Sequence, residues 1–566
     1  MNPKKNAVLA AATAAALLSV AACGGSNSAP GSSGSGGSGS SNGAVLPNTA
    51  WKTASYDSVK QGGTLVQAVG QLPTNYNQLQ ANDGLGDTIT IENPAISQTG
   101  VKFSSDGKWE VDPNYIESAK LISKSPQKIQ VKLNPKAVWS DGKPITYTDV
   151  VNFWKAYNGK NPKYEILSDA GWRDIKSIDK GASDYEYTIT YSKVNADWPN
   201  SMYPALPTAV TKDPNTFNTG FTKKMYPSNG PFVISKIDAN AGVITETPNP
   251  RWWGRKPKLD KIVFRVVNQN SLGQAFANKE INLLDTQANP DVLAQAQKRS
   301  DAVIQKSGGL TWTHLTFNAS KGPLADVHVR RAIANAIDRK TFVTVTQKQL
   351  GVKPAVQGSV VYVPGQAGYK DISTSEIAYS PKTVASEMKA AGYTKGSGGV
   401  YAKGGTPLSL KILVPSDTPT NAQRAQLIQG FLKKVGITVT LDTVPTDKYF
   451  SDYILKKNYD MTSFSWQGTP FPVSTTQSLF DPADAGQNFT GITDPRLSGL
   501  WDKANGELDP TKQQKIANDI DKVIFDYVPI VTLGTTPTIW AVQKGLVNAG
   551  AAQFQTPDYT EVGFTK

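Results

Sequence analysis

Apolar and polar residues alternate with a period of two in several short stretches of the chain. Ile129, Val131 and Leu133 are separated by polar residues, and the alternation recurs over 185–191. A period of two places every second side chain on the same face of an extended strand, so both stretches predict half-buried strands. The same signal predicts further strands at 64–69, 262–266 and 312–317.

Other apolar residues follow the spacing of an amphipathic helix. Thr146 and Asp149 have the spacing of a capping box ahead of an apolar run that begins at Val150, which predicts the start of a helix. Residues 326–340 predict a second helix, whose apolar face consists of Val329, Ile333, Ala336 and Ile337. The charged residues of that helix are expected to stay in water or to pair with carboxylates: Arg330, Arg331 and Lys340.

The clearest connectivity lies within 408–441. An alternating strand, a helix and a second strand follow one another there, and Gly436 stands where a helix end requires a left-handed residue. Such a unit requires parallel strands and a right-handed crossover. A late helix over 516–527 is stopped by Pro529 and followed by another strand. Strands that alternate with helices predict an α/β body.

The N-terminus has the layout of a secretory signal, with two lysines, an apolar run over 7–18 and small residues after it. The run is too short to span a bilayer. The sequence Val20-Ala21-Ala22-Cys23 resembles the bacterial lipoprotein box, which implies that residues 1–22 are removed and that Cys23 carries a diacylglyceryl thioether. Lipidation of this kind anchors a protein stably. The alternative is a buried thiol after ordinary export.

Composition limits the remaining possibilities. The 566 residues are 39% hydrophobic and 19% charged, which is sufficient for two or three globular domains. After the Gly/Ser-rich stretch 23–61, which is expected to be a flexible tether, no segment is apolar enough to span a membrane. The net charge of +13 is spread along the chain, so a basic face for anionic lipid or cell-wall polymer is possible and nucleic acid is not an expected partner. With one cysteine and two histidines, neither a metal site nor a cofactor is expected.

Four stretches, taken in order, resemble the bacterial extracellular solute-binding proteins of family 5, which include the oligopeptide- and dipeptide-binding lipoproteins of ABC transporters. Together they cover nearly the whole mature chain. The loop Trp466-Gln467-Gly468-Thr469-Pro470-Phe471-Pro472, which lacks the Asp usual in peptide-binding relatives, resembles an actinobacterial-type subgroup of this family. The tryptophans within the four stretches are expected to pack in the core rather than to hold ligand. The stretches are 131–150 with WSDGKP, 228–260 with SNGPF, NPRWWG and KPKLD, 317–339 with FN and DVHVRRAI, and 435–439 with VGITV.

The resemblance implies a two-lobed α/β fold of the periplasmic-binding-protein type II class (cluster C), with an extra subdomain in lobe I. Lobe I is expected to comprise residues 62–309, with the inserted subdomain at about 96–220. Lobe II is expected at 310–530, and 531–566 return to lobe I. The chain would then cross between the lobes twice, which forms a hinge about which the lobes close on a ligand.

The ligand is expected beyond the carboxyl ends of the strands, in the loops that border the cleft. In peptide-binding relatives the stretch that begins at Trp466 carries an Asp that pairs with the ligand's α-ammonium, and here the nearest downstream acid is Asp481. Aromatic and amide side chains remain, and they suit neutral polar ligands, sugars among them. The predicted ligand-binding residues are Asn75, Tyr76, Trp466, Gln467, Thr469, Phe471, Asn488 and Phe489.

The sequence therefore predicts a monomeric, lipid-anchored receptor on the outer face of the cell membrane. It would deliver an oligopeptide-like solute to the permease subunits of an ABC importer, and it is expected not to be an enzyme. A hydrolase would have to use His314 or His328, and no nucleophile elbow or zinc-binding helix accompanies them. The alternative is a cell-envelope lipoprotein of the same fold that binds a glycan or lipoglycan and regulates wall assembly.

Overall fold

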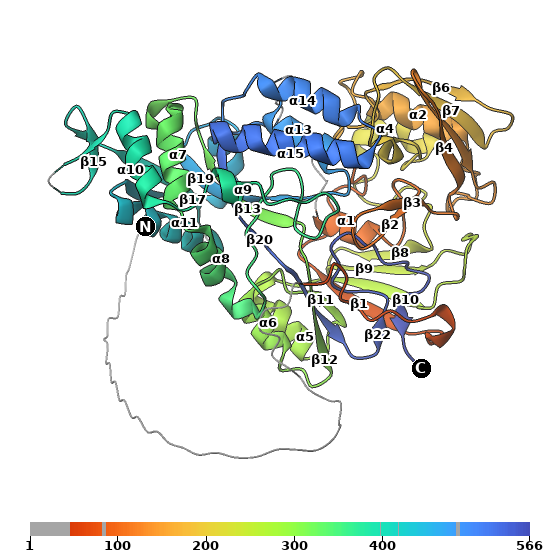
Figure 1. The fold of residues 1–566 in the computed structure, drawn as a ribbon. Helices are drawn as coiled ribbons and strands as arrows, with labels where there is room; N and C mark the ends of the chain where they lie inside the picture. Colours follow the sequence, from red (N-terminus) through yellow and green to blue (C-terminus); the bar gives the residue numbers. More distant parts are fainter. Residues whose placement is uncertain (1–45, 82–85, 397, 417, 483–486) are drawn as a thin grey trace, which may run out of the picture. The chain divides into compact units, whose positions relative to one another are not determined.

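Most of the alternating stretches form strands of two principal β-sheets, with helices packed around them (Figure 1). The alternating stretches at 129–133 and 185–191 belong to a further, four-stranded sheet. The structure is a computed structural model that describes residues 46–81, 86–396, 398–416, 418–482 and 487–566. The signal peptide, Cys23 and the first part of the tether predicted above therefore lie outside the described residues.

The first principal sheet has seven strands in the order β12-β21-β11-β1-β10-β9-β8. β1 pairs in parallel with β10 and β11, and the remaining neighbours are antiparallel. The strands are β1 (Thr64–Val69), β8 (Phe232–Asp238), β9 (Val243–Pro248), β10 (Lys261–Val266), β11 (Leu283–Asp285), β12 (Ala302–Ser307) and β21 (Thr538–Gln543).

The second principal sheet has five strands in the order β18-β17-β19-β13-β20. It contains the predicted parallel unit, in which β17 and β18 are parallel and α11 (Pro419–Val435) connects them. Gly436 ends α11 at a φ of +94°, in the left-handed region that the sequence required. The strands are β13 (Thr311–Phe317), β17 (Ser409–Pro415), β18 (Thr438–Val444), β19 (Met461–Gln467) and β20 (Ile530–Thr535).

A four-stranded antiparallel sheet lies within the segment predicted as the inserted subdomain, in the order β4-β5-β7-β6. Its strands are β4 (Ile116–Lys124), β5 (Gln127–Leu133), β6 (Ile175–Lys180) and β7 (Glu186–Tyr191). The predicted capping box is present at the start of α2 (Tyr147–Tyr157), with both reciprocal hydrogen bonds made. Smaller sheets pair β2 (Val101–Phe103) with β3 (Trp109–Val111), β22 (Leu546–Val547) with β23 (Gly563–Phe564), and β14 (Thr394–Lys395) with β15 (Tyr401–Lys403) and β16 (Thr406–Pro407).

Helices flank these sheets, and α14 and α15 run side by side in Figure 1. The remaining α-helices are α1 (Gly86–Glu92), α3 (Thr208–Thr211), α4 (Pro214–Thr219), α5 (Leu272–Ala277), α6 (Pro290–Ala296), α7 (Val327–Ala336), α8 (Arg339–Gln347), α9 (Ser373–Glu376), α10 (Pro381–Ala390), α12 (Thr446–Lys448), α13 (Pro472–Phe480), α14 (Arg496–Asn505) and α15 (Pro510–Tyr527).

The single helix predicted over 326–340 is wrong in two respects. The chain breaks at Ile337, which has an extended conformation, because the Asp338 side chain accepts a hydrogen bond from Thr341 N and starts a new helix, α8. Arg330 is buried rather than solvated, and its guanidinium donates to the carbonyl oxygens of Tyr527 and Val528 at the end of α15.

Two large apolar cores follow the two principal sheets. One packs the seven- and four-stranded sheets together, and the other surrounds the five-stranded sheet. Residues 308–310 connect β12 to β13, and 536–537 connect β20 to β21, so the chain passes between the sheets at two places. The two connections touch, because Thr536 N donates to Thr311 O at 2.8 Å.

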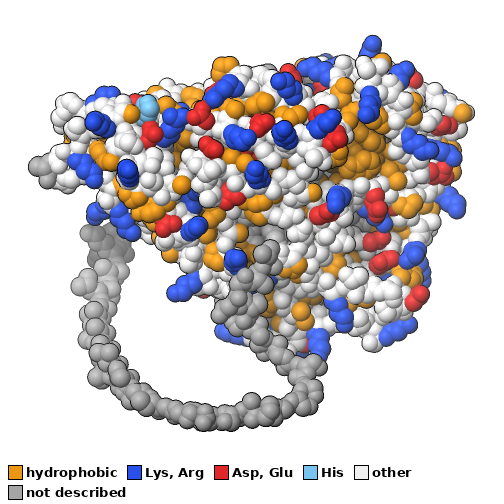
Figure 2. All heavy atoms as spheres, viewed as in Figure 1, with side chains coloured by type: hydrophobic (Ala, Val, Ile, Leu, Met, Phe, Trp, Pro, Cys, Tyr) orange, Lys and Arg blue, Asp and Glu red, His pale blue; other side chains and the backbone are white. Residues whose placement is uncertain are grey.

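The surface charge is dispersed. Figure 2 shows Lys and Arg side chains scattered among Asp and Glu on the visible face, without a continuous basic patch. Among the described residues, none of the helices has the length and apolar character needed to cross a bilayer. The same residues contain no group of three or more His, Cys, Asp or Glu side chains arranged to hold a metal ion.

Candidate functional site

An aromatic cluster stands where β19 ends. The register of the antiparallel pair β13–β19 places Trp466 opposite Trp312 and Phe464 opposite His314. The Trp466 ring stacks on the His314 ring at a centroid distance of 3.9 Å and an interplanar angle of 22°. Phe464 contacts both Trp466 and Phe489 edge-on, at 5.7 and 6.0 Å. Two of the predicted ligand residues, Trp466 and Phe489, are therefore joined through Phe464.

His314 is a neutral packing group within this cluster. It is fully buried, its Nδ1 bonds Thr316 Oγ1 at 2.8 Å, and its Nε2 has no hydrogen-bond partner among the described residues. Burial, with a smaller contribution from the Arg424 cation, lowers its pKa to about 3. A histidine in this state packs against the Trp466 ring without contributing charge at neutral pH. His328, by contrast, lies on α7 and bonds Glu387 through Nδ1.

The loop after Trp466 contacts residues that belong to the side of the molecule with the seven- and four-stranded sheets. Gln467 is exposed, and Thr469 is fixed by its carbonyl, which accepts from Gln366 Nε2 at 2.9 Å. Phe471 meets Phe103 of β2 edge-on at 5.7 Å. At the start of α13 the backbone N–H of Ser474 donates to Asp197 Oδ2 at 3.3 Å.

The other predicted residues make internal contacts. Asn75 Nδ2 donates to Asn218 O at 2.7 Å, and Asn488 Nδ2 donates to Ile492 O at 2.7 Å. Tyr76 is 2% exposed, and burial together with the charge of Glu92 raises its pKa to about 12. Each of these two amides thus donates one N–H to a backbone carbonyl and accepts a backbone N–H at Oδ1, and a ligand role for all eight residues stays a prediction.

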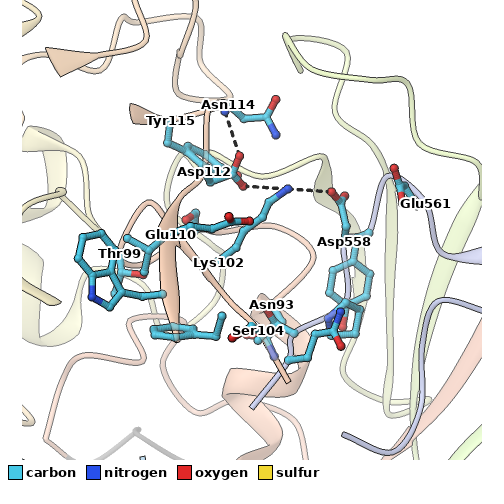
Figure 3. A pocket seen from close by; sticks show the side chains of 18 of the residues that line it. Asn93, Thr99, Lys102, Ser104, Glu110, Asp112, Asn114, Tyr115, Asp558 and Glu561 are labelled. Atoms are coloured by element: carbon cyan, nitrogen blue, oxygen red, sulfur yellow. Dashed lines mark hydrogen bonds and ion pairs between the residues drawn. The ribbon is translucent and has the colours of Figure 1, made fainter. Parts of the chain in front are cut away.

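A cavity of about 770 Å³ opens elsewhere, between the β2–β3 hairpin and the C-terminal segment 548–561 (Figure 3). None of the eight predicted ligand residues lines it. Its walls combine aromatic rings, amides and charged groups, which is the composition of a polar ligand site. No pattern in the sequence predicts this cavity.

The β2–β3 hairpin forms one wall of the cavity, and its turn follows from the local sequence. The Asp-Gly pair at 106–107 forms the turn, with Gly107 at a φ of +84°, and Ser104 N donates to Lys108 O at 2.8 Å. The Ser104 hydroxyl donates to Asp106 Oδ1 at 2.6 Å and fixes the tip. Phe103 and Trp109 face each other in the register and stand at the cavity.

The charged centre of the cavity is Lys102, which Figure 3 shows between Asp112 and Asp558. Its Nζ is 3.6 Å from Asp112 Oδ2 and 3.1 Å from Asp558 Oδ2. Burial raises the pKa of Asp112, against the opposing charge of Lys102. Burial also acts to raise the pKa of Asp558, but Lys102 and hydrogen bonds from Thr560 outweigh it and lower this pKa. Both carboxylates are thus partly desolvated and depend on a cation.

This centre has no signal in the sequence, because Lys102 and Asp558 are 456 residues apart. Trp252 was expected only to pack in the core. It does pack against Tyr115, at 6.0 Å, and against Trp253, at 4.6 Å, but it also lines the cavity. A motif such as WWG therefore contributes one face to packing and one to the site.

Two comparisons with known proteins identify the family to which this architecture belongs. The family model described as "Bacterial extracellular solute-binding proteins, family 5 Middle" matches residues 110–488. The chain is 32% identical to the oligopeptide-binding protein OppA of Mycobacterium tuberculosis over 514 residues, which are 90% of this chain and 86% of that protein.

Further similarities are structural or more distant. The periplasmic EDTA-binding protein EppA superposes with a TM-score of 0.83 at 25% identity, covering 93% of this chain and all of that one. The oligopeptide-binding protein AppA from Bacillus subtilis, solved with a nonapeptide, superposes with a TM-score of 0.73 at 20% identity, covering 90% and 100%. A probable monoacyl phosphatidylinositol tetramannoside-binding protein, LpqW of M. tuberculosis, is 24% identical over 59% of this chain and 56% of that protein.

The match of the family model and the identity over nine-tenths of the chain agree with the fold, which is that of type II periplasmic binding proteins. The chain belongs to the bacterial extracellular solute-binding proteins of family 5, and it is a binding receptor rather than an enzyme.

Proposed function

We propose that this protein is the lipid-anchored receptor of an ABC importer and that its solute is an oligopeptide. The observation that carries the proposal is the 32% identity to the oligopeptide-binding protein OppA, which extends over 90% of the chain. The structure solved with a nonapeptide, AppA, supports the same solute class through its fold. The protein would stand on the outer face of the cell membrane as a monomer.

Binding would proceed by closure about a hinge formed by the two connections at 308–310 and 536–537. Gln553 Nε2 donates to the carbonyl oxygens of Gly309 and Pro364, at 3.0 and 2.6 Å, and fastens the first connection to the C-terminal segment. Short paired connections allow rotation while the cores remain rigid. In this proposal one lobe comprises residues 62–307 with 538–566, and the other comprises 311–535, because β20 belongs to the five-stranded sheet.

The ligand in this proposal lies between the loop after Trp466 and the β2–β3 hairpin. Two contacts support this position, the Phe471–Phe103 ring pair and the Ser474–Asp197 hydrogen bond, because each joins elements of the two principal cores. Trp466, backed by His314, offers an aromatic face, and Gln467 offers an exposed amide. Peptide backbones and side chains are held by this combination of groups.

The anchor is tested through Cys23. Cells that express the wild-type chain and a Cys23→Ala variant are labelled with radioactive palmitate and fractionated. We expect label and membrane retention in the wild type only. Equal membrane retention without label in both chains would contradict the anchor and leave the solute class unaffected.

The solute class is tested with the mature protein in detergent micelles. A library of peptides of increasing length is screened by thermal unfolding, since a ligand at 100 times its Kd stabilises the folded state by about 2.7 kcal/mol. A melting temperature raised by some peptides, with loss of peptide uptake in a deletion strain, supports the proposal. A library that gives no shift would contradict it.

The similarity to LpqW favours one second candidate, a cell-envelope lipoprotein that binds a glycan or lipoglycan and regulates wall assembly. Mannosylated phosphatidylinositol is therefore included in the same screen. Stabilisation by the mannolipid alone, together with accumulation of wall precursors in the deletion strain, would favour the regulator. Co-purification with permease subunits would favour import.

A further inference from the structure

The cavity between the β2–β3 hairpin and segment 548–561 has more negative than positive groups in its wall. Among the described residues that line it, two are lysines, Lys102 and Lys108, and five are carboxylates. Lys108 pairs with Asp106 at 2.7 Å, and Arg255, just outside the lining, pairs with Glu561 at 3.0 Å. Of the remaining carboxylates, Asp112 and Asp558 share the single cation of Lys102, and Glu110 lines the cavity as an exposed carboxylate.

The two central carboxylates are oriented toward a cation. In each, one oxygen is held by its own loop: Asp112 Oδ1 accepts from Asn114 N at 2.9 Å, and Asp558 Oδ1 accepts from Thr560 N at 3.0 Å. The other oxygen of each faces Lys102 Nζ. One ammonium between two partly buried carboxylates leaves negative charge uncompensated, and a low-dielectric wall makes that charge attractive to a second cation.

The aromatic part of the wall suits the same guest. The indole rings of Trp51, Trp109 and Trp252 line the cavity beside these carboxylates. Ammonium and guanidinium groups are attracted to the faces of indole rings, most strongly where water is excluded. Phe103 also lines the cavity and touches Phe471 on the loop after Trp466, so the cavity adjoins the proposed ligand position.

On the basis of the proposed function, we propose that this cavity is a subsite for a cationic group of the bound peptide, held by Asp112, Asp558 and Glu110 against the indole rings. The group is either the α-ammonium or a Lys or Arg side chain. The subsite would supply the counter-charge that the loop after Trp466 lacks, since the nearest acid there, Asp481, is buried and accepts from Ser498 Oγ at 3.0 Å.

The test compares peptides that differ in one charge. A peptide that binds the mature protein is titrated by calorimetry in three forms: unmodified, N-acetylated, and with each basic residue replaced by norleucine. We expect one neutral form to bind the wild type at least about tenfold more weakly, since a charge-assisted hydrogen bond contributes this much or more. The form that loses affinity identifies which cationic group occupies the subsite.

Variants assign the effect to the cavity. Asp558→Asn and Glu110→Gln should reduce the preference for the charged form to less than about threefold while the neutral form binds as before. Glu110 is exposed, so its variant tests the proposal even if Asp558→Asn is unstable. The matched control is Asp184→Asn, which removes a carboxylate from a surface pair with Lys180 and should leave the preference unchanged.

Lys102→Met should change the preference for the charged peptide in the opposite direction. Removing the internal cation should increase the preference for the charged peptide, because the carboxylates then lack their partner. A preference that is unchanged or falls would overturn the subsite. Equal binding of charged and neutral peptides by the wild type would also overturn it and leave the peptide receptor intact, whereas failure of every peptide to bind would overturn both proposals.

Discussion

At the scale of single residues, burial decides what the ionisable groups of this protein can do. His314 is fully enclosed by aromatic rings, with Trp466 stacked on one face and Phe464 at 4.4 Å. Its lowered pKa follows from this enclosure. Such a group contributes shape rather than charge at neutral pH, and it supports the ring that is predicted to touch ligand.

The burial of His314 predicts a pH dependence of stability. Above pH 6.5 the histidine is neutral in both folded and unfolded chains. Below it the unfolded chain binds a proton that the folded chain refuses, because the folded pKa is about 3. The free energy of unfolding should therefore fall as the pH falls from 6.5 toward 3, by up to about 1.4 kcal/mol per pH unit from this group. Denaturant unfolding at several pH values measures it.

The matched variants are His314→Phe, which keeps the ring, and His328→Phe, which changes a histidine whose side chain is 40% exposed. The slope between pH 6 and 4 should decrease only in His314→Phe. An identical slope in the wild type and in His314→Phe would show that His314 is protonated in the folded protein.

At the scale of elements, one arginine fastens α7 to the end of α15. Burial lowers the pKa of Arg330 to about 10, so its guanidinium remains charged at neutral pH. It donates to Tyr527 O and Val528 O, and also to Leu324 O and Ala325 O before α7. Terminal carbonyls that lack a partner within their own helix are thus satisfied by a side chain from another helix. The adjacent Arg331 makes a half-exposed pair with Asp526.

Truncation of Arg330 should destabilise the folded protein, because its guanidinium satisfies these carbonyl groups. Arg330→Met leaves buried carbonyl groups unpaired, and we expect the free energy of unfolding to fall by about 3 kcal/mol. Arg331→Met, on the same helix, removes a half-exposed ion pair and two hydrogen bonds to the single carbonyl oxygen of Asp526, and it should cost only about 1 kcal/mol because water can replace these partners. Urea unfolding of both variants gives the comparison. Similar losses in the two would show that the buried hydrogen bonds contribute little.

The elements also show where sequence patterns succeed. The capping box of α2 and the β17-α11-β18 unit were predicted and are present, because both depend on residues close in sequence. The break at Ile337 was missed, since the apolar stripe continues across it and only the local hydrogen bond of Asp338 ends the helix. Periodicity reports which face is buried and not where the backbone turns.

At the scale of the whole molecule, two cores and two touching connections determine how the parts can move. A Cβ added to Gly309 would lie 1.7 Å from the carbonyl oxygen of Thr536. The two connections are therefore so close at this point that only glycine, which has no Cβ, fits there. This packing brings the proposed pivots together. Rotation about them would carry the loop after Trp466 relative to the β2–β3 hairpin.

Gly309→Ala should therefore disturb the hinge. The added methyl group must push the connections apart, and overpacking of this kind costs about 1–3 kcal/mol. Gly430→Ala in α11 is the control, because nothing lies within 4 Å of its added Cβ and alanine favours a helix. Thermal unfolding should separate the two variants, and a Gly309→Ala protein as stable as the wild type would contradict the close packing.

Ligand-dependent closure is the prediction that belongs to the whole molecule. The radius of gyration from small-angle scattering should decrease when a stabilising peptide is added. In Trp466→Ala the peptide should bind more weakly, by roughly tenfold if the ring covers the ligand. A peptide that binds without any change in radius would argue against the hinge.

The sequence by itself determined the family, the alternation of strands and helices and the local motifs, because these depend on short-range periodicity and on residues adjacent in the chain. It also predicted Trp466, at the end of β19, and Phe489, further along the chain, as aromatic site residues, and the structure joins the two through Phe464. Only the tertiary structure decided which polar groups remain available. Asn75 and Asn488 each donate an amide N–H to a backbone carbonyl, while Lys102 and Asp112 meet Asp558, 456 residues from Lys102, to form a charged cavity. Contacts between distant segments arise from packing, and packing leaves no periodic pattern in the chain.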